Sequence, residues 1–125
     1  MVFMGKRILL VDDEADIRAI YKKIIETGGY EVATAKSGVE ALEKMSTFKP
    51  HLVVLDIMMP EMDGWEVAQR IRKKNNELPI IMLTIKGEIE DKVKSVEEAG
   101  ANRHLTKPVE RSILISSIQA LLDEL

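Results

Sequence analysis

The amino-acid sequence predicts a single α/β domain in which a doubly wound parallel β-sheet is covered by helices on both faces. The chain, residues 1–125, has the length of one domain, and no linker-like stretch divides it. Short apolar runs recur along it without polar alternation, as is typical of strands buried on both faces. Helical patterns separate these runs, and such a regular alternation of strand and helix favours a parallel sheet.

The first half of the chain contains two strand–helix units. The strand RILLV (7–11) precedes a helix that ends at Gly28-Gly29. The apolar residues of this helix recur at steps of three and four: Ile17, Ile20, Tyr21, Ile24 and Ile25. The strand EVATA (31–35) follows, and Ser37 with Glu40 forms a capping box for a second helix. The apolar face of that helix contains Val39, Leu42 and Met45.

The second half contains three more units. The strand LVVL (52–55) precedes the helix Gly64–Lys74, whose start is marked by Asp63 and Glu66. The strand PIIML (79–83) precedes a helix over Glu88–Glu98 that stops at Gly100 and carries Ile89, Val93 and Val96 inward. The strand NRHLT (102–106) is the weakest because it is the most polar. A last helix begins just after Pro108 and runs through Ile113, Ile115, Ile118 and Leu122.

The composition excludes several classes of function. The net charge is −3, and the basic residues are scattered, so the sequence shows no electrostatic footprint for nucleic acid. Cysteine is absent, which excludes disulfides, thiolate metal sites and thiol catalysis. The N-terminal MVFMGKR is too short for a signal peptide, and no apolar run is long enough to span a membrane. We therefore expect a cytoplasmic protein that binds neither nucleic acid nor membrane.

Chemically active residues stand where the predicted strands end. Asp12 and Asp13 follow the first strand, Asp56 ends the third, Thr84 the fourth and Lys107 the fifth. In open parallel sheets, ligands bind beyond the carboxyl ends of the strands. We therefore expect three carboxylates, one hydroxyl and one amine to converge on one edge of the sheet.

This set of side chains matches the chemistry of a phosphoryl group. Neighbouring carboxylates repel each other unless a cation is present, and oxygen ligands without His or Cys favour Mg²⁺ or Mn²⁺ over zinc. A carboxylate beside such a metal can attack phosphorus and form an acyl phosphate. The metal, Lys107 and the Thr84 hydroxyl could then each neutralise one phosphoryl oxygen.

Each of these residues also has a more ordinary interpretation when it is taken alone. The Asp12-Asp13 pair could cap a helix, although Asp16 is better placed for that role. Asp56 could be a turn residue, Thr84 a β-branched strand residue and Lys107 a solvated loop lysine. The functional interpretation is favoured because all of them fall at strand ends on the same edge of the sheet.

Taken together, the motifs resemble the receiver domain of two-component response regulators. The resemblance rests on Asp12-Asp13 after RILLV, on LDIMMPEMDG around Asp56, on IIMLT ending at Thr84 and on LTKP around Lys107. It covers nearly the whole chain. It implies a flavodoxin-like (βα)5 three-layer sandwich with a five-stranded parallel sheet in the order 2-1-3-4-5.

The resemblance also implies a role for each matching residue. Asp56 is similar to the aspartate that accepts phosphate from a sensor histidine kinase, a phosphotransfer protein or a small acyl phosphate. Asp13 corresponds to a direct Mg²⁺ ligand, and Asp12 contacts the ion or its water. The backbone carbonyl of Met58 corresponds to the third protein ligand.

Thr84 and Lys107 correspond to the groups that engage the phosphoryl oxygens, and the Lys107–Pro108 bond is expected to be cis. Phosphorylation is then expected to draw Thr84 and Lys107 inward. The surface of the fourth helix, fifth strand and fifth helix is expected to change its affinity for partners as a result. The expected partners are an output protein or an effector domain outside this chain, and a second copy bound as a homodimer through that surface. Because the chain stops near the expected end of the fifth helix, we expect either a stand-alone regulator or a receiver cut from a longer protein.

The sequence departs from the family pattern near the expected acceptor. His104 occupies the position of the usual strand-five aromatic, and it could couple to Thr84 or simply pack at the surface. Ile85 replaces a small residue and is expected to narrow access to Asp56. Met58 and Lys86 flank the expected path of water, so we hypothesise that Met58, Ile85 and Lys86 slow the loss of phosphate.

Three other functions compete with a phosphorylated receiver. A phosphohydrolase with an aspartyl nucleophile would place an acid at Met58, which cannot transfer protons. A flavodoxin-like cofactor carrier would have a phosphate cradle after the first strand, where this chain has the acidic VDDEA. A pseudo-receiver that only binds partners would lack an acid or the lysine. We therefore expect a signalling switch, which catalyses only its own phosphotransfer and slow dephosphorylation, rather than an enzyme.

Overall fold

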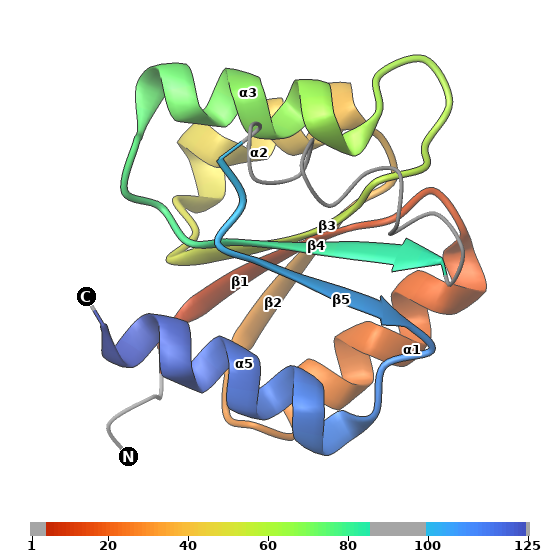
Figure 1. Ribbon diagram of the computed structural model, residues 1–125, viewed down its shortest axis with the longest axis vertical. Coiled ribbons are helices and arrows are strands. Elements are labelled where there is room, and N and C mark those ends of the chain that lie inside the picture. The colour runs from red at the N-terminus through yellow and green to blue at the C-terminus, as the bar shows by residue number, and fades with distance from the viewer. Residues whose placement is uncertain (1–4, 86–99, 125) are drawn as a thin grey trace.

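The computed structural model describes residues 5–85 and 100–124. Their five strands form one parallel sheet in the order β2-β1-β3-β4-β5, so the predicted fold class and strand order are confirmed (Figure 1). The strands are β1 (Arg7–Val11), β2 (Glu31–Ala35), β3 (Leu52–Asp56), β4 (Ile80–Ile85) and β5 (Arg103–Lys107). The helices are α1 (Ala15–Glu26), α2 (Gly38–Phe48), α3 (Gly64–Lys74) and α5 (Arg111–Asp123). The helix expected over residues 88–98 lies outside the described residues, as does Lys86.

The strand ends differ from the prediction by one or two residues. β3 includes Asp56 as its last residue, and β5 includes Lys107 as its last residue. β4 continues to Ile85, so the prediction that Thr84 ends this strand is wrong by one position. The extension follows from pairing, because Ile85 lies opposite Lys107 in the parallel register of β4 and β5. Asp56, Thr84 and Lys107 still lie at the carboxyl edge of the sheet.

Side chains of the three central strands alternate between two separate cores, as the pleat of a strand requires. On one face, Leu9, Val53 and Met82 pack with residues of α2 and α3. On the other face, Leu10, Val54 and Leu83 pack with residues of α1 and α5. Figure 1 shows the same three layers, with α2 and α3 on one side of the sheet and α1 and α5 on the other. This double burial explains why the strands are apolar without alternation.

The starts of two helices have the caps that the sequence predicts. The Ser37 hydroxyl accepts a hydrogen bond from the Glu40 amide at 3.1 Å, and the Asp63 carboxylate accepts one from the Glu66 amide at 3.0 Å. A cap by Asp16 is wrong, because α1 begins after Glu14 and Asp16 lies in its first turn. None of the helices in the described ranges is both long and apolar enough to cross a membrane.

Candidate functional site

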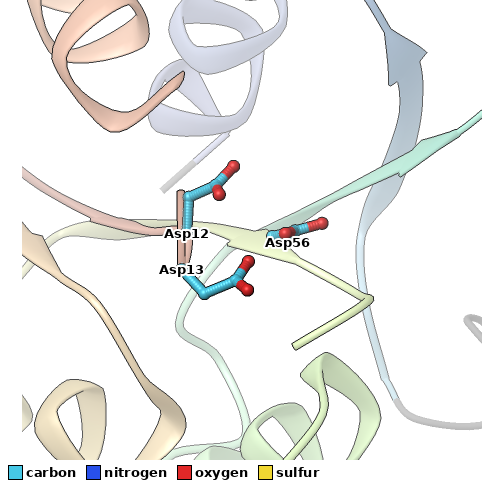
Figure 2. Close-up of side chains that lie close together, drawn as sticks. All are labelled: Asp12, Asp13 and Asp56. Carbon is cyan, nitrogen blue, oxygen red and sulfur yellow. The ribbon is translucent and has the colours of Figure 1, made fainter. Parts of the chain in front are cut away.

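Three carboxylates meet at the carboxyl edge of the sheet. Asp12 and Asp13 directly follow β1, and Asp56 ends the neighbouring strand β3. One carboxylate oxygen from each residue lies within 4.8 Å of the other two (Figure 2). Asp12 is 0% exposed and Asp56 is 4% exposed, whereas Asp13 is more open to solvent. The sheet therefore places two buried acids and one accessible acid around a single point.

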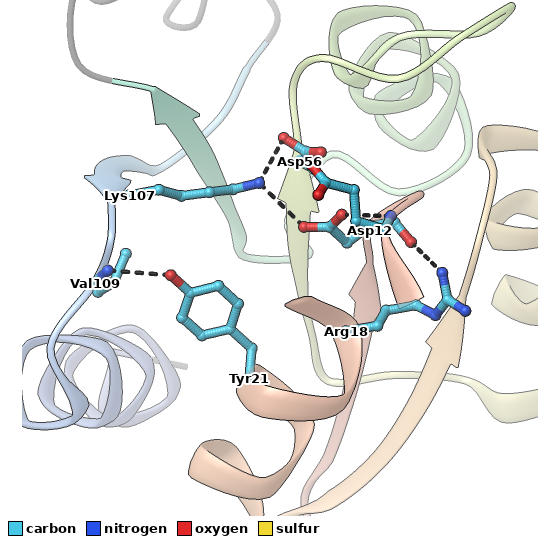
Figure 3. Close-up of polar contacts among 7 residues, drawn as sticks. Asp12, Arg18, Tyr21, Asp56, Lys107 and Val109 are labelled. Carbon is cyan, nitrogen blue, oxygen red and sulfur yellow. Dashed lines mark hydrogen bonds and ion pairs between the residues drawn. The ribbon is translucent and has the colours of Figure 1, made fainter. Parts of the chain in front are cut away.

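Lys107 reaches the two buried carboxylates from β5. Its Nζ lies 3.1 Å from Asp12 Oδ2 and 3.2 Å from Asp56 Oδ1 (Figure 3). Because β4 lies between β3 and β5, the lysine side chain spans the end of β4 to make these ion pairs. Its side chain is only 15% exposed. The site therefore contains three negative charges and one positive charge, most of them shielded from water.

This burial changes the proton affinity of the paired groups. The pKa of the Asp56 carboxyl is raised from 3.8 to about 6, because burial disfavours its charged form more strongly than the Lys107 ammonium stabilises it. The negative charges of Asp12 and Asp13 act in the same direction as burial. Burial alone would lower the pKa of Lys107, but the Asp56 and Asp12 carboxylates outweigh it and the pKa is raised. At neutral pH the site is therefore charged, and its net charge is negative.

Asp12 is held by hydrogen bonds at all of its polar groups. Its amide donates to Ala35 O at 3.1 Å, and its Oδ1 accepts from the Glu14 amide at 2.9 Å. Its carbonyl accepts from Arg18, and its Oδ2 accepts from Lys107. In the ranges that the structure describes, the Asp13 carboxylate has no hydrogen bond. Asp12 is thus fixed, whereas Asp13 is free to coordinate a ligand.

A close backbone contact positions the loop after Asp56. The Gly64 amide donates to Ile57 O at 2.8 Å, where the loop joins α3. A Cβ at Gly64 would lie 2.6 Å from the Asp56 carbonyl oxygen, so any larger residue would push the loop away from the strand end. Glycine is therefore required at this position because the two backbones approach closely, a reason that the sequence analysis did not identify.

Thr84 lies at the same edge, but its hydroxyl makes no hydrogen bond to the charged groups. It follows Leu83, which is paired with Asp56, and it is only 2% exposed. Its Oγ1 is buried and has no hydrogen-bond partner among the described residues. A buried hydroxyl without a partner is unusual in a folded protein, and here it is a donor available to a ligand or to a rearranged site.

Three more of the predicted residues lie within the described ranges, at this edge or along β5. The side chains of Met58 and Ile85 are large and apolar, yet 45% and 51% exposed. His104 is half-buried on β5, opposite Met82. The bond between Lys107 and Pro108 is cis, which is the isomer that the resemblance implied.

Two polar contacts of α1 are not indicated by the sequence patterns. Arg18 donates from Nη1 to the Asp12 carbonyl, and the Tyr21 hydroxyl accepts from the Val109 amide (Figure 3). Tyr21 was included only as an apolar helix residue. No local pattern indicates either contact, because each partner is brought to α1 by the tertiary fold.

The donor set at this edge suits a hard divalent cation. Three carboxylate oxygens lie close enough to share one ion, and neither of the two histidines nor any cysteine contributes to the cluster. Oxygen-only sites of this kind favour Mg²⁺ or Mn²⁺. Burial is the main cause of the raised pKa of Asp56, and repulsion from Asp12 and Asp13 adds to it; a cation among the carboxylates would relieve that repulsion.

Comparisons with known proteins are consistent in their results. A family model described as the response regulator receiver domain matches residues 8–119. The chain is 44% identical to the alkaline phosphatase synthesis transcriptional regulatory protein PhoP of Bacillus subtilis, over 95% of this chain and 49% of that protein. It is 39% identical to the response regulator MprA of Mycobacterium ulcerans, over 95% of this chain and 51% of that protein. The chain thus spans about half the length of these curated relatives.

Solved structures give the same result. A CheY-like response regulator receiver domain protein from Methanospirillum hungatei superposes with a TM-score of 0.88 at 36% identity, covering 96% of this chain and 95% of that one. The chemotaxis protein CheY4 of Vibrio cholerae superposes with a TM-score of 0.86 at 32% identity, covering 94% of this chain and 98% of that one.

Proposed function

This chain belongs to the response regulator receiver domain family, and from that membership we propose that Asp56 accepts a phosphoryl group in a Mg²⁺-dependent reaction. The observation that carries the proposal is the cluster in which Lys107 bridges Asp12 and Asp56 beside Asp13. The sensor histidine kinase of a two-component system, or a phosphotransfer protein, is the proposed donor. We infer a cytoplasmic location, where such donors would present their phosphohistidine.

The metal site would be formed by the acidic cluster. Asp13 would ligate Mg²⁺ directly, Asp56 would supply a second oxygen, and Asp12 would contact the ion or its water. The backbone carbonyl of Met58 would complete the protein ligands. When bound, the cation neutralises negative charge on the carboxylates and on the phosphoryl oxygens. Mn²⁺ has the same preference for oxygen ligands and would serve in its place.

The covalent step belongs to Asp56. A carboxylate oxygen of Asp56 attacks the phosphorus of a phosphohistidine or an acyl phosphate and forms a new P–O bond. The bond from phosphorus to the donor breaks, and its electron pair leaves with the imidazole or carboxylate of the donor. The raised pKa of Asp56 still leaves it ionised at neutral pH, as a nucleophile must be.

Lys107 and Thr84 would stabilise the product. The Lys107 ammonium already lies 3.2 Å from an Asp56 oxygen, so a phosphoryl group on Asp56 would remain within its reach. Thr84 would donate its unpaired hydroxyl to a phosphoryl oxygen. Contact of Thr84 and Lys107 with the phosphoryl group would shift the ends of β4 and β5. Because His104 also lies on β5, this shift would change the affinity of the neighbouring surface for an output partner or a second copy.

A labelling experiment tests the proposal. Purified protein is incubated with acetyl phosphate and Mg²⁺, and phosphoryl uptake is measured by intact mass. We expect one phosphoryl group per chain, no uptake with a chelator, and none in Asp56→Ala or Asp56→Asn. Asp16→Asn, which removes an exposed acid of α1, should label like the parent.

The same experiment separates a switch from an enzyme. Uptake that persists without the Asp56 carboxylate would contradict the proposed acceptor, and no uptake at all would favour a binding module. Fast multiple turnover of acetyl phosphate or another phosphate ester would favour a phosphohydrolase. We expect only slow turnover, because Met58 offers no acid or base at the second position after Asp56.

A further inference from the structure

Helix α1 contacts two loops at the site, one that contains Asp12 and Asp13 and one that directly follows Lys107. Arg18 Nη1 donates to the carbonyl of Asp12, at 2.8 Å, in the loop that joins β1 to α1. The Tyr21 hydroxyl accepts from the amide of Val109, at 3.1 Å, in the loop that joins β5 to α5. Arg18 and Tyr21 are three positions apart, which places them on adjacent turns of one helix face. Figure 3 shows their side chains reaching from this helix to the two different loops.

The Arg18 contact completes the set of hydrogen bonds that immobilise Asp12. Without it, the Asp12 carbonyl would keep no partner among the described residues, whereas the amide and both carboxylate oxygens would keep theirs. That carbonyl belongs to the peptide that joins Asp12 to Asp13. The direction of the Asp13 side chain therefore depends on this peptide, because its own carboxylate has no hydrogen bond within the described ranges.

The Tyr21 hydrogen bond anchors the loop between β5 and α5 to helix α1. Tyr21 is 5% exposed and Val109 is 8% exposed, so the hydrogen bond between them is shielded from water. A buried amide that loses its acceptor is costly, so the chain at Val109 is strongly held in place. Val109 lies two residues after Lys107, so this contact limits how far the end of β5 can move.

We propose that Arg18 and Tyr21 are positioning residues for two different halves of the site. Arg18 orients the acidic loop that binds the metal, and Tyr21 orients the strand end that presents Lys107 to the phosphoryl group. This inference rests on the proposed function. It adds that a single helix face sets the distance between the metal-binding acids and the lysine.

The sign of the change in metal affinity distinguishes a positioning role of Arg18 from a purely electrostatic effect of its charge. A guanidinium beside an acidic cluster repels a cation, so its removal should tighten metal binding if charge alone mattered. A positioning role predicts instead that removal of Arg18 weakens metal binding. Mutation of a residue that orients metal ligands typically weakens metal affinity by 10- to 100-fold. For the loss of a hydrogen bond to one backbone carbonyl we expect roughly tenfold weaker binding.

The test of Arg18 is a titration with Mn²⁺, in which free ion is counted by electron paramagnetic resonance. The parent is compared with Arg18→Met and with Lys23→Met, which removes an exposed cation from the same helix. We expect Arg18→Met to raise the dissociation constant roughly tenfold and Lys23→Met to leave it close to that of the parent. An unchanged or tighter affinity in Arg18→Met would overturn the proposal. If that variant does not fold by circular dichroism, Arg18→Lys, which keeps the charge but shortens the reach, is measured with the same expected direction.

The test of Tyr21 is the rate of phosphoryl uptake, which depends on the position of Lys107. Tyr21→Phe is labelled with acetyl phosphate at saturating Mg²⁺ beside Tyr30→Phe, which loses a hydroxyl from the same core. We expect labelling of Tyr21→Phe to slow by about tenfold, since small misplacements of a reacting group have effects of that size or larger. Its Mn²⁺ affinity should match that of the parent. Labelling at the parental rate, or equal losses in Tyr21→Phe and Tyr30→Phe, would contradict the role of Tyr21.

Measurements on the parent distinguish a failure of the proposed function from a failure of the positioning roles. A parent that binds no Mn²⁺ and takes up no phosphoryl group would refute the proposed function. A parent that does both, with variants indistinguishable from it, would refute only the positioning roles of Arg18 and Tyr21.

Discussion

Replacing Asp56 by asparagine should make the fold more stable at neutral pH, although it removes the proposed acceptor. Asp56 is 4% exposed, lies beside two other carboxylates and has a raised pKa of about 6 in the folded protein. An acid with a raised pKa in the folded state binds its proton more tightly there than in the unfolded chain. Its ionised form therefore destabilises the fold, and asparagine has a similar shape without the charge.

The size of the effect follows from the shift in pKa. The change from 3.8 to about 6 corresponds to about 3 kcal/mol of unfolding free energy once the group is fully ionised in both states. The stability of the parent falls as pH rises through the interval between these two values, and the loss is complete above it. At pH 7.5 without divalent ions, Asp56→Asn should therefore exceed the parent by up to about 3 kcal/mol, or about 10 °C in Tm. At pH 5 the gain should shrink to about half that value.

Urea unfolding followed by circular dichroism measures these differences. Both proteins are unfolded at each pH in a chelating buffer, with Asp16→Asn as the control. That control removes an exposed acid from the first turn of α1 and should lose up to about 0.5 kcal/mol, the opposite sign. Added Mg²⁺ should then stabilise the parent more than Asp56→Asn, because the Asp56 carboxylate is one of the ligands of the proposed metal site in the folded protein. An Asp56→Asn variant that is no more stable than the parent, or a gain that does not depend on pH, would refute the electrostatic reasoning.

Three further changes have expected outcomes. Ile85→Ala should shorten the lifetime of the phosphorylated protein, because the large side chain at the end of β4 is expected to obstruct the path of water to Asp56. The lifetime is measured by loss of the phosphoryl mass after removal of donor, and equal lifetimes would eliminate this steric explanation. Gly64→Ala should lower the free energy of unfolding by about 2 kcal/mol or more, since its Cβ would lie 2.6 Å from the Asp56 carbonyl oxygen, and an unchanged urea midpoint would show that the loop adapts without cost. Ser37→Ala should lower the free energy of unfolding by about 1 kcal/mol, because it removes the acceptor of the Glu40 amide at the start of α2; Ser46→Ala, within the same helix, should change it much less.

The fold was predictable because its determinants are local in sequence. β1, β2 and α3 occupy the ranges that the sequence patterns indicated. β1 is recognisable because a strand buried on both faces is apolar throughout, and α3 is recognisable because Asp63 and Glu66 mark its start. The caps at Ser37 and Asp63 were predictable for the same reason, because each cap and its amide partner are three residues apart. The strand order was not accessible from these patterns, and it came from the family resemblance. No sequence pattern within β2 indicates that it pairs with β1 at the edge of the sheet.

The candidate site was predictable in composition but not in geometry. Asp12 and Asp13 are identical neighbours in the sequence, yet one is fully buried and held at every polar group, while the other is accessible. Their difference arises from the alternation of the strand that they follow and from contacts with distant residues. The ion pairs of Lys107 and the unpaired hydroxyl of Thr84 depend in the same way on the positions of neighbouring strands. Sequence patterns indicate which groups reach the sheet edge, and tertiary packing decides which of them touch.

The charge balance of the site explains why the proposed modification would act as a switch. Three carboxylates and one ammonium leave a net charge of −2 at neutral pH, which one divalent cation would cancel. A phosphoryl group replaces the single charge of Asp56 with up to two, so the cation and Lys107 would no longer suffice. The excess must attract a further donor, and the Thr84 hydroxyl is a buried polar atom at this edge that has no hydrogen bond within the described ranges. Because Thr84 is bonded into β4 beside β5, its movement toward the site would be transmitted to the outer strands of the sheet rather than absorbed locally.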